Sequence, residues 1–209
     1  MLDERLGLVH LSTGELFRQE ISRRTALGGR VSRYVSRGLL VPDALVVRVM
    51  TSRLTPGRLR RGIVLDGFPR TVGQAEGLDR FLRRLRQPLG AAVYLACSNA
   101  VLLARLGGRQ VCSRCGAIYH VRNLPPRRRG ICDRCHGKLV VRRDDRVATV
   151  KKRLQVDTAQ AKPLLDYYTS RRLLHRLNAN GSSEHVFKRA VGLFRRQGWD
   201  DPPTCLPRR

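Results

Sequence analysis

Aromatic and acidic residues are both scarce in this sequence. Phe, Trp and Tyr make up 5% of the 209 residues, so the chain lacks the stacking platform with which single-stranded nucleic acid is usually bound. No apolar run is long enough to span a membrane, and the first residues do not have the pattern of a secretory signal peptide. We therefore expect a cytoplasmic protein with no membrane partner, and we expect it to be a monomer.

Basic residues are in large excess. Lys and Arg together number 42 against 16 Asp and Glu, which gives a formal net charge of +26, and only five of the 42 are lysine. Such a charge is typical of proteins that bind nucleic acid or another polyanion. The arginines are scattered through almost every segment, however, which a coding bias toward Arg explains equally well. We expect nonspecific nucleic-acid binding at low salt and no specific nucleic-acid partner.

The apolar pattern predicts alternating helices and short buried strands. A chain of this length with 42% hydrophobic residues can form one core with a smaller attached module. Helices are expected at residues 15–24, 31–36, 43–54, 73–86, 98–106, 146–168 and 183–197, and strands at 62–65, 91–95 and 173–177. We expect Gly28-Gly29 to break the helical pattern and Asp43 to cap the helix that follows it. Strands separated by helices indicate a parallel α/β sheet.

Four cysteines form two C-x-x-C pairs. Cys112 and Cys115 are followed after sixteen residues by Cys132 and Cys135, a spacing that suits one tetrahedral metal ion, most simply structural zinc. Structural zinc supplies roughly 10–16 kcal/mol of apparent binding free energy to such small modules. Two disulfides are the alternative, but thiols persist in the reducing compartment that we expect. The remaining cysteines, Cys97 and Cys205, belong to no such pattern.

Two further segments have residue types suited to phosphate chemistry. Residues 66–71 follow a buried strand, at the edge where α/β sheets bind ligands. There Asp66 could orient water on Mg²⁺ and Arg70 could hold a phosphate. Residues 12–18 join a helix start to Arg18, which lies four positions after Gly14. This arrangement would present backbone amides and a guanidinium group to an anion.

Taken together, these segments resemble the adenylate kinases, the nucleoside monophosphate kinases that convert ATP and AMP into two ADP. The motifs occur in family order over about residues 2–195. They are Leu11–Arg18, Gly38–Asp43, Leu65–Thr71 with Gln74, Gly108-Arg109, Tyr119-His120, Val141–Asp145, Thr149–Leu154 and Pro163–Tyr168. The resemblance implies an α/β fold like that of the P-loop NTPases. It comprises a parallel sheet flanked by helices, an inserted zinc-bearing lid and a small helical part that binds the monophosphate.

The resemblance also implies three groups of site residues. The AMP-binding residues would be Thr13, Arg18, Leu39, Leu40, Val41, Gly67, Phe68, Pro69, Arg70, Gln74, Arg142 and Arg153, with Gln74 contacting the adenine edge. The ATP-binding residues would be Arg105, Arg109, Ile118, Tyr119 and Gly181. Arg70, Arg109, Arg142 and Arg153 would surround the transferred phosphoryl group, and Asp66 would serve the hydrated Mg²⁺ that accompanies ATP. Zinc would be structural and remote from the chemistry.

By the same resemblance the chain divides into four parts. The core would comprise residues 1–11, 42–107 and 146–198, and the AMP-binding region residues 12–41. The zinc-binding lid would cover 108–145, with hinge positions at Gly107 and Gly108, and a flexible tail would cover 199–209.

One family feature has no match in the sequence. The family pattern includes a glycine-rich loop of the form G-x-x-x-x-G-K-[ST] that cradles the ATP phosphates, and the only Gly-Lys pair here is Gly137-Lys138, inside the lid. Because Met1–Gly7 resembles the end of the first family helix, we expect the first strand and this P-loop to be missing. The chain as given would then be impaired in ATP binding or inactive, through a start assigned too far downstream or a non-catalytic product.

Two other functions stay open at this point. A basic zinc-knuckle protein that binds nucleic acid would account for the charge and the cysteine pairs. A catalytically silent remnant that still binds AMP would account for the absent loop.

Overall fold

The computed structural model describes residues 7–142, 145 and 147–198. The chain forms two compact units. The first unit comprises Met1–Ser32, Val41–Ala96 and Asp157–Arg209, and the second comprises Arg33–Leu40 and Cys97–Val156. The expected lid falls within the second unit, whereas the expected AMP-binding region is divided between both. The four-part division therefore stays a prediction, and its tail, 199–209, lies outside the described residues.

The first unit contains four parallel strands in two pairs. Strand β1 (Val9–Ser12) pairs with β2 (Ile63–Asp66), with Ser12 opposite Asp66. Strand β3 (Ala92–Ala96) pairs with β7 (Leu174–Asn178). The parallel α/β architecture is thus confirmed, although the described strands form two pairs where one sheet was expected. Sequence reasoning missed β1 because His10 and Ser12 interrupt its short apolar pattern.

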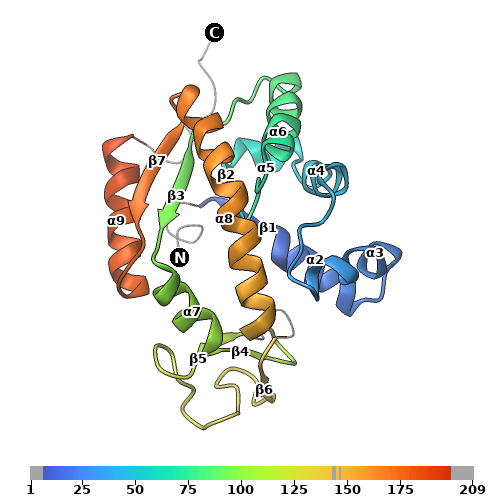
Figure 1. The fold of residues 1–209 in the computed structure, drawn as a ribbon, viewed down its shortest axis with the longest axis vertical. Helices are drawn as coiled ribbons and strands as arrows, with labels where there is room; N and C mark the ends of the chain where they lie inside the picture. The colour runs from blue at the N-terminus through green and yellow to red at the C-terminus, as the bar shows by residue number, and fades with distance from the viewer. Residues whose placement is uncertain (1–6, 143–144, 146, 199–209) are drawn as a thin grey trace. The chain divides into compact units, whose positions relative to one another are not determined.

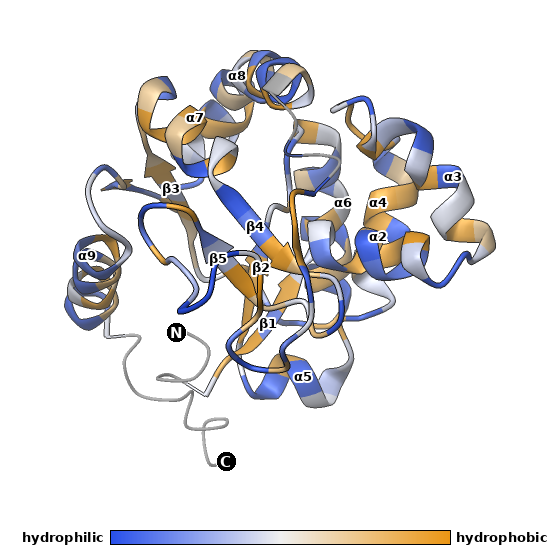
Figure 2. Cartoon of the chain, turned by 90° about the horizontal axis from the view of Figure 1, so that it is seen from below, coloured by the Kyte–Doolittle hydropathy of each residue, from blue (hydrophilic) through white to orange (hydrophobic). Residues whose placement is uncertain are grey.

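Amphipathic helices surround these strands (Figure 1). They are α2 (Thr13–Ser22), α3 (Ala26–Val35), which continues into the second unit, α4 (Asp43–Thr51), α5 (Pro56–Arg60), α6 (Val72–Arg84) and α9 (Ser183–Arg196). Helix α9 packs on β7, where Leu177, Ala190 and Leu193 form a buried cluster. Figure 2 shows the distribution of hydropathy in this unit, with hydrophobic residues along β1 and β2 and a mixture of polar and hydrophobic residues along α9.

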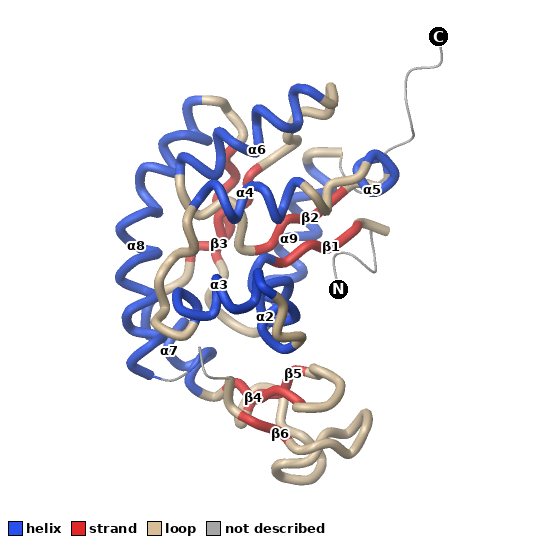
Figure 3. The backbone as a smooth tube through the Cα atoms, turned by 90° about the vertical axis from the view of Figure 1, so that its right-hand side faces the viewer, coloured by secondary structure: helices blue, strands red, loops and turns tan. Residues whose placement is uncertain are grey.

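The second unit combines helices with a small antiparallel sheet. Helix α7 (Asn99–Gly107) leads into β4 (Arg109–Cys112), which is flanked by β5 (Ile118–His120) and β6 (Leu139–Val140). Long loops join these short strands (Figure 3). Helix α8 (Val147–Ser170) begins in this unit and ends in the first, with Pro163 inside it. The buried core of the sheet is small and consists of Cys112, Tyr119, Cys132 and Leu139.

Two sequence predictions about helix ends are wrong. Gly28-Gly29 does not break the helical pattern, because α3 runs through both glycines. Its start is fixed instead by Thr25, whose hydroxyl accepts the Gly28 N–H at 3.0 Å. Asp43 does not cap α4, since Pro42 occupies the cap position and Asp43 is the first helical residue.

The two adjacent glycines of α3 differ sharply in their surroundings. A Cβ at Gly28 would lie 2.2 Å from the Glu20 carbonyl oxygen, whereas a Cβ at Gly29 would have no atom within 4 Å. The close approach of α2 to α3 therefore depends on Gly28 alone.

We predict opposite effects for the two substitutions to alanine. Gly28→Ala should lower the free energy of unfolding by about 1–3 kcal/mol, because backbone must move to admit the methyl group. Gly29→Ala should raise it by roughly 0.5–1 kcal/mol, because alanine restricts the unfolded chain. Urea unfolding of both variants checks this, and equal effects would show that the close approach at Gly28 has no energetic importance.

Candidate functional site

The carboxyl ends of β1 and β2 lie side by side because the strands are parallel and in register. Helix α2 leaves β1 at Thr13, and the loop 67–70 leaves β2 directly opposite. The buried Thr13 hydroxyl donates to the Gly67 carbonyl at 2.9 Å. The two predicted phosphate-binding segments are therefore joined at one edge, as expected for ligand sites of parallel sheets.

Arg70 is fixed against the same carbonyl. Its Nε donates to the Gly67 oxygen at 2.9 Å, and its Nη1 lies 3.4 Å from Asp157 Oδ1. Gly67 has φ +69, and a Cβ there would lie 2.9 Å from Arg70 Nη2. Only glycine tolerates both this backbone conformation and the close side chain. The Phe68-Pro69 peptide within the loop is cis.

Arg18 folds back over the start of its own helix. A Cβ at Gly14 would lie 3.1 Å from Arg18 Nη1, so the guanidinium occupies the space beside the first turn of α2. A helix N-terminus carries partial positive charge and unpaired N–H groups. The Arg18 guanidinium and the first turn of α2 therefore lie side by side, and anion binding there stays a prediction.

Gln74 is buried at the start of α6 and both ends of its amide are bonded. Its Oε1 accepts the Arg70 N–H at 2.9 Å, and its Nε2 donates to Asp43 Oδ1 at 2.8 Å. The other Asp43 oxygen accepts the Thr71 hydroxyl at 2.7 Å. Asp43 thus ties α4 to α6, a role that sequence reasoning missed when it assigned this residue as a cap.

Asp66 ends β2 with an exposed carboxylate. Its side chain is 62% exposed and lies 3.6 Å from His10 Nε2. An accessible carboxylate at the strand end suits Mg²⁺, which keeps several of its waters and is usually held through one or two carboxylates and substrate phosphates.

In the second unit, Gly38 lets the backbone that leads into residues 39–40 pass close to α8. It has φ +67, and a Cβ there would lie 2.7 Å from the Thr149 carbonyl oxygen and 2.9 Å from Arg153 Cγ. Leu39 is 40% exposed beyond this contact. Gly38, the first residue of the Gly38–Asp43 motif, thus leaves room for the stem of Arg153.

Arg109 forms a two-pronged ion pair with Asp145. Its Nε donates to Asp145 Oδ2 at 2.7 Å, and its Nη2 donates to Oδ1. The Asp145 side chain is fully buried and that of Arg109 is 23% exposed. Such a pair fixes the guanidinium plane. Sequence reasoning did not include Asp145 among the site residues, although it closes the Val141–Asp145 motif.

The other lid residues of the site differ in accessibility. Ile118 is 50% exposed on β5, whereas Tyr119 is buried and its hydroxyl accepts the Asp133 N–H at 2.8 Å. Tyr119 therefore serves the lid core. Arg105 on α7 places its Nη1 3.8 Å from Cys97 Sγ.

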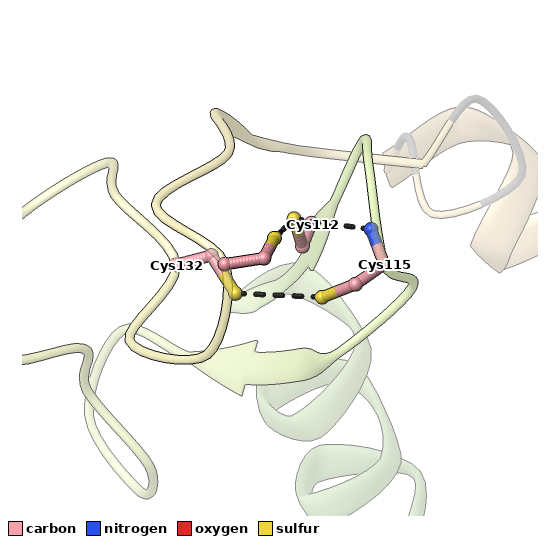
Figure 4. Close-up of side chains that lie close together, drawn as sticks. Cys112, Cys115 and Cys132 are labelled. Atoms are coloured by element: carbon pink, nitrogen blue, oxygen red, sulfur yellow. Dashed lines mark hydrogen bonds between the residues drawn. The ribbon is translucent and has the colours of Figure 1, made fainter.

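The four lid cysteines converge on one point (Figure 4). All four sulfur atoms lie within 4.8 Å of one another, with 3.4 Å between Cys112 and Cys135 and 3.5 Å between Cys115 and Cys132. A tetrahedral ion with Zn–S bonds of about 2.3 Å requires sulfur separations of about 3.8 Å. The four cysteines are thus placed to bind a metal ion. The disulfide alternative is not seen, because all cysteines of the described residues are free.

Local hydrogen bonds favour the thiolate at two of these positions. The Tyr119 hydroxyl lowers the pKa of Cys132 to about 6, and the Cys115 amide lowers the pKa of Cys112. At Cys135 the Gly137 amide lowers the pKa, but the hydrogen bonds with the Cys115 and Cys112 thiols outweigh it and raise the pKa to about 12. Thiolates are the form that binds metal.

Comparison with known proteins decides the family. The family model described as adenylate kinase matches residues 1–173. An adenylate kinase of Clostridium botulinum is 41% identical over 187 residues, 90% of this chain and 87% of the relative. One of Caldicellulosiruptor bescii is 42% identical over 173 residues, 83% of this chain and 80% of the relative. The chain belongs to the adenylate kinase family.

This kinase is therefore an enzyme that phosphorylates nucleoside monophosphates, as the motifs predicted. The comparisons do not favour the alternatives of a nucleic-acid-binding zinc knuckle or a silent remnant. Within the described residues, no helix is long and apolar enough to cross a membrane.

The predicted site residues of the kinase divide between its two units. The first unit holds Thr13, Arg18, Val41, Asp66, Gly67, Phe68, Pro69, Arg70, Gln74 and Gly181. The second holds Leu39, Leu40, Arg105, Arg109, Ile118, Tyr119, Arg142 and Arg153.

Metal binding by the lid can be tested at one ligand. Cys132→Ser should lose the metal and unfold the lid at lower temperature, because the lid core is too small to fold without it. Cys97→Ser removes a thiol outside the cluster and should keep the metal. Metal content by mass spectrometry and amide exchange in residues 109–120 measure both effects. Full metal retention in Cys132→Ser would contradict the assignment.

The Arg109–Asp145 pair should contribute strongly to lid stability. Asp145→Asn keeps the shape but removes the charge, and we expect the lid to lose about 3 kcal/mol, because Arg109 is left without its buried partner. The double variant with Arg109→Gln should be less destabilised than the sum of the two single variants. Amide exchange in β4 measures this, and strict additivity would argue against a coupled pair.

Proposed function

We propose that this kinase catalyses reversible phosphoryl transfer from ATP to AMP, giving two ADP. The observation that supports this most directly is the anion site at the ends of β1 and β2. There Thr13 and Arg70 meet at the Gly67 carbonyl, and Arg18 lies over the start of α2. A monophosphate would accept hydrogen bonds from these guanidinium groups and from the helix amides.

The AMP site would be completed by the loop residues around it. Gly67, Phe68 and Pro69 would lie along the nucleotide, the backbone of residues 39–41 would border it, and Gln74 would contact the adenine edge. Because the Gln74 amide is held at both ends, it would meet the base in one orientation. A held amide discriminates between bases better than a mobile one.

The lid would bind ATP and help to stabilise the transferred group. Arg109 uses Nε and Nη2 for Asp145, which leaves Nη1 for phosphate. Arg105, Ile118, Tyr119 and Gly181 would complete the ATP side. Arg70, Arg109, Arg142 and Arg153 would offset the charge of the phosphoryl group, since this reaction needs positioning and charge stabilisation rather than a covalent nucleophile.

Two metal ions have separate parts in the proposal. Zinc at the four cysteines would be structural, since four thiolates leave no open coordination position. Mg²⁺ would accompany ATP, with Asp66 orienting its waters, and it would offset phosphate charge. The cytoplasmic location, the monomeric state, nonspecific nucleic-acid binding at low salt and the absence of the P-loop stay predictions.

Calorimetry and an ADP-forming assay test the function together. Arg70→Ala should weaken AMP binding tenfold to about a hundredfold, because a charge-assisted hydrogen bond contributes about 1.5–3 kcal/mol. Arg84→Ala, an exposed change on α6, should leave AMP binding unchanged. A bisubstrate dinucleotide should bind more tightly than AMP.

Two outcomes would count against the proposal. Equal AMP affinity in Arg70→Ala and the unaltered chain would show that Arg70 does not bind the AMP phosphate. AMP binding with no enhancement by the dinucleotide and no ADP formation would favour a catalytically silent AMP-binding chain.

A further inference from the structure

The lid carries an excess of positive charge that the kinase site does not use. Residues 108–142 contain nine basic residues and one acidic residue, Asp133. Three of the nine, Arg109, Arg122 and Arg142, lie at the sheet or its connections. The other six, all exposed, are here called the basic lid cluster: Arg114, Arg127, Arg128, Arg129, Arg134 and Lys138.

The metal site gathers this cluster from three separate stretches of chain. Arg114 and Arg134 lie inside the two C-x-x-C turns, whose sulfur atoms converge within 4.8 Å. The Ser113 N–H donates to the Lys138 carbonyl at 3.0 Å, which places Lys138 beside the first turn. The Arg127 N–H donates to Asp133 Oδ1 at 3.0 Å, which attaches the arginine run to the second turn.

Little negative charge opposes the cluster. Asp133 is the one acidic residue of the segment 108–142, and a carboxylate oxygen of Asp133 is already hydrogen-bonded to a backbone amide. Among the ion pairs of the described residues, none includes a member of the cluster. Some basic residues elsewhere do have an acidic partner on their own helix, as in Arg80–Glu76 on α6 and Lys188–Glu184 on α9. A zinc ion with four thiolates would add a charge of about −2, which leaves the lid strongly positive.

The absence of exposed aromatic residues narrows the class of partner. Tyr119 is the only aromatic residue of the lid segment 108–142, and it is buried with its hydroxyl bonded. Bases of a single strand would therefore find no exposed Phe, Tyr or Trp ring to stack on in this segment. Exposed guanidinium groups bind phosphate oxygens well, and a duplex presents phosphates at a fixed density of about one charge per 1.7 Å.

We propose that the basic lid cluster binds the phosphate backbone of double-stranded nucleic acid, without sequence preference. This would be a second binding surface on the kinase, and it includes none of the residues assigned to AMP, ATP or phosphoryl transfer. Its geometry depends on the metal, because the converging cysteine turns bring the three stretches together.

The test compares two triple variants of the full chain with the same change in charge. The lid variant is Arg127→Gln with Arg128→Gln and Arg129→Gln. The control is Arg83→Gln with Arg84→Gln and Arg86→Gln, at exposed positions on and just after α6. Binding of a fluorescent 20-base-pair DNA duplex is followed by anisotropy at several salt concentrations.

The lid variant should bind the duplex at least tenfold more weakly at 50 mM salt, and the control should change by less than twofold. The slope of log affinity against log salt should become shallower in the lid variant, by about 0.9 for each phosphate that the protein no longer neutralises. Cys132→Ser should weaken duplex binding as much as the lid variant. AMP binding by the lid variant, measured by calorimetry, should equal that of the unaltered chain, which separates this proposal from the proposed function.

Three results would overturn the proposal. Equal reductions in affinity in the two triple variants would assign binding to the net charge of the whole chain. Tighter binding of single-stranded than of duplex DNA would exclude backbone recognition of a duplex. Anionic phospholipid vesicles that bind with the same dependence on the lid arginines would show a general anion-binding surface.

Discussion

The parallel pairing of β1 with β2 is the constraint on which the candidate site depends. With Ser12 opposite Asp66, the start of α2 and the loop after β2 emerge at one edge. The Gly67 carbonyl there accepts hydrogen bonds from Thr13 and from Arg70. A shift of one residue in this register would turn the side chains of one strand to the opposite face. The strand pair thus brings two separate sequence motifs together at one edge of the strands.

The interactions that stabilise the lid differ from those of the strand pair. Its buried core of four residues is too small to stabilise a module of this length, and two of those residues are cysteines. The buried Arg109–Asp145 pair, together with a metal if one binds at the four converging cysteines, would supply what the apolar core does not. Both are polar interactions with strict geometry, so they hold the lid in one arrangement while leaving Ile118 and the outer arginines exposed.

The arginines of this chain have two kinds of surroundings. Arg70 and Arg109 each lie beside a carboxylate, Asp157 and Asp145, which orients the guanidinium and leaves other N–H groups for phosphate. The arginines of the basic lid cluster have no such partner among the ion pairs of the described residues. Oriented arginines suit catalysis, which needs fixed charge, whereas a group of exposed arginines suits a polyanion whose phosphates are many and equivalent.

The sequence by itself determined the family, the metal ligands and most of the elements, because these depend on local spacing. Each of these patterns can be recognised in a short stretch of sequence: the two C-x-x-C pairs, the apolar runs of β2, β3 and β7, and the ordered motifs. Only the tertiary structure decided the roles of Gly28, Asp43 and Asp145. Each acts on a group that packing brings to it: Glu20 in the preceding helix, Gln74 at 31 residues' separation and Arg109 at 36. Such contacts leave no local pattern, since the chain between the partners can vary without changing their distance.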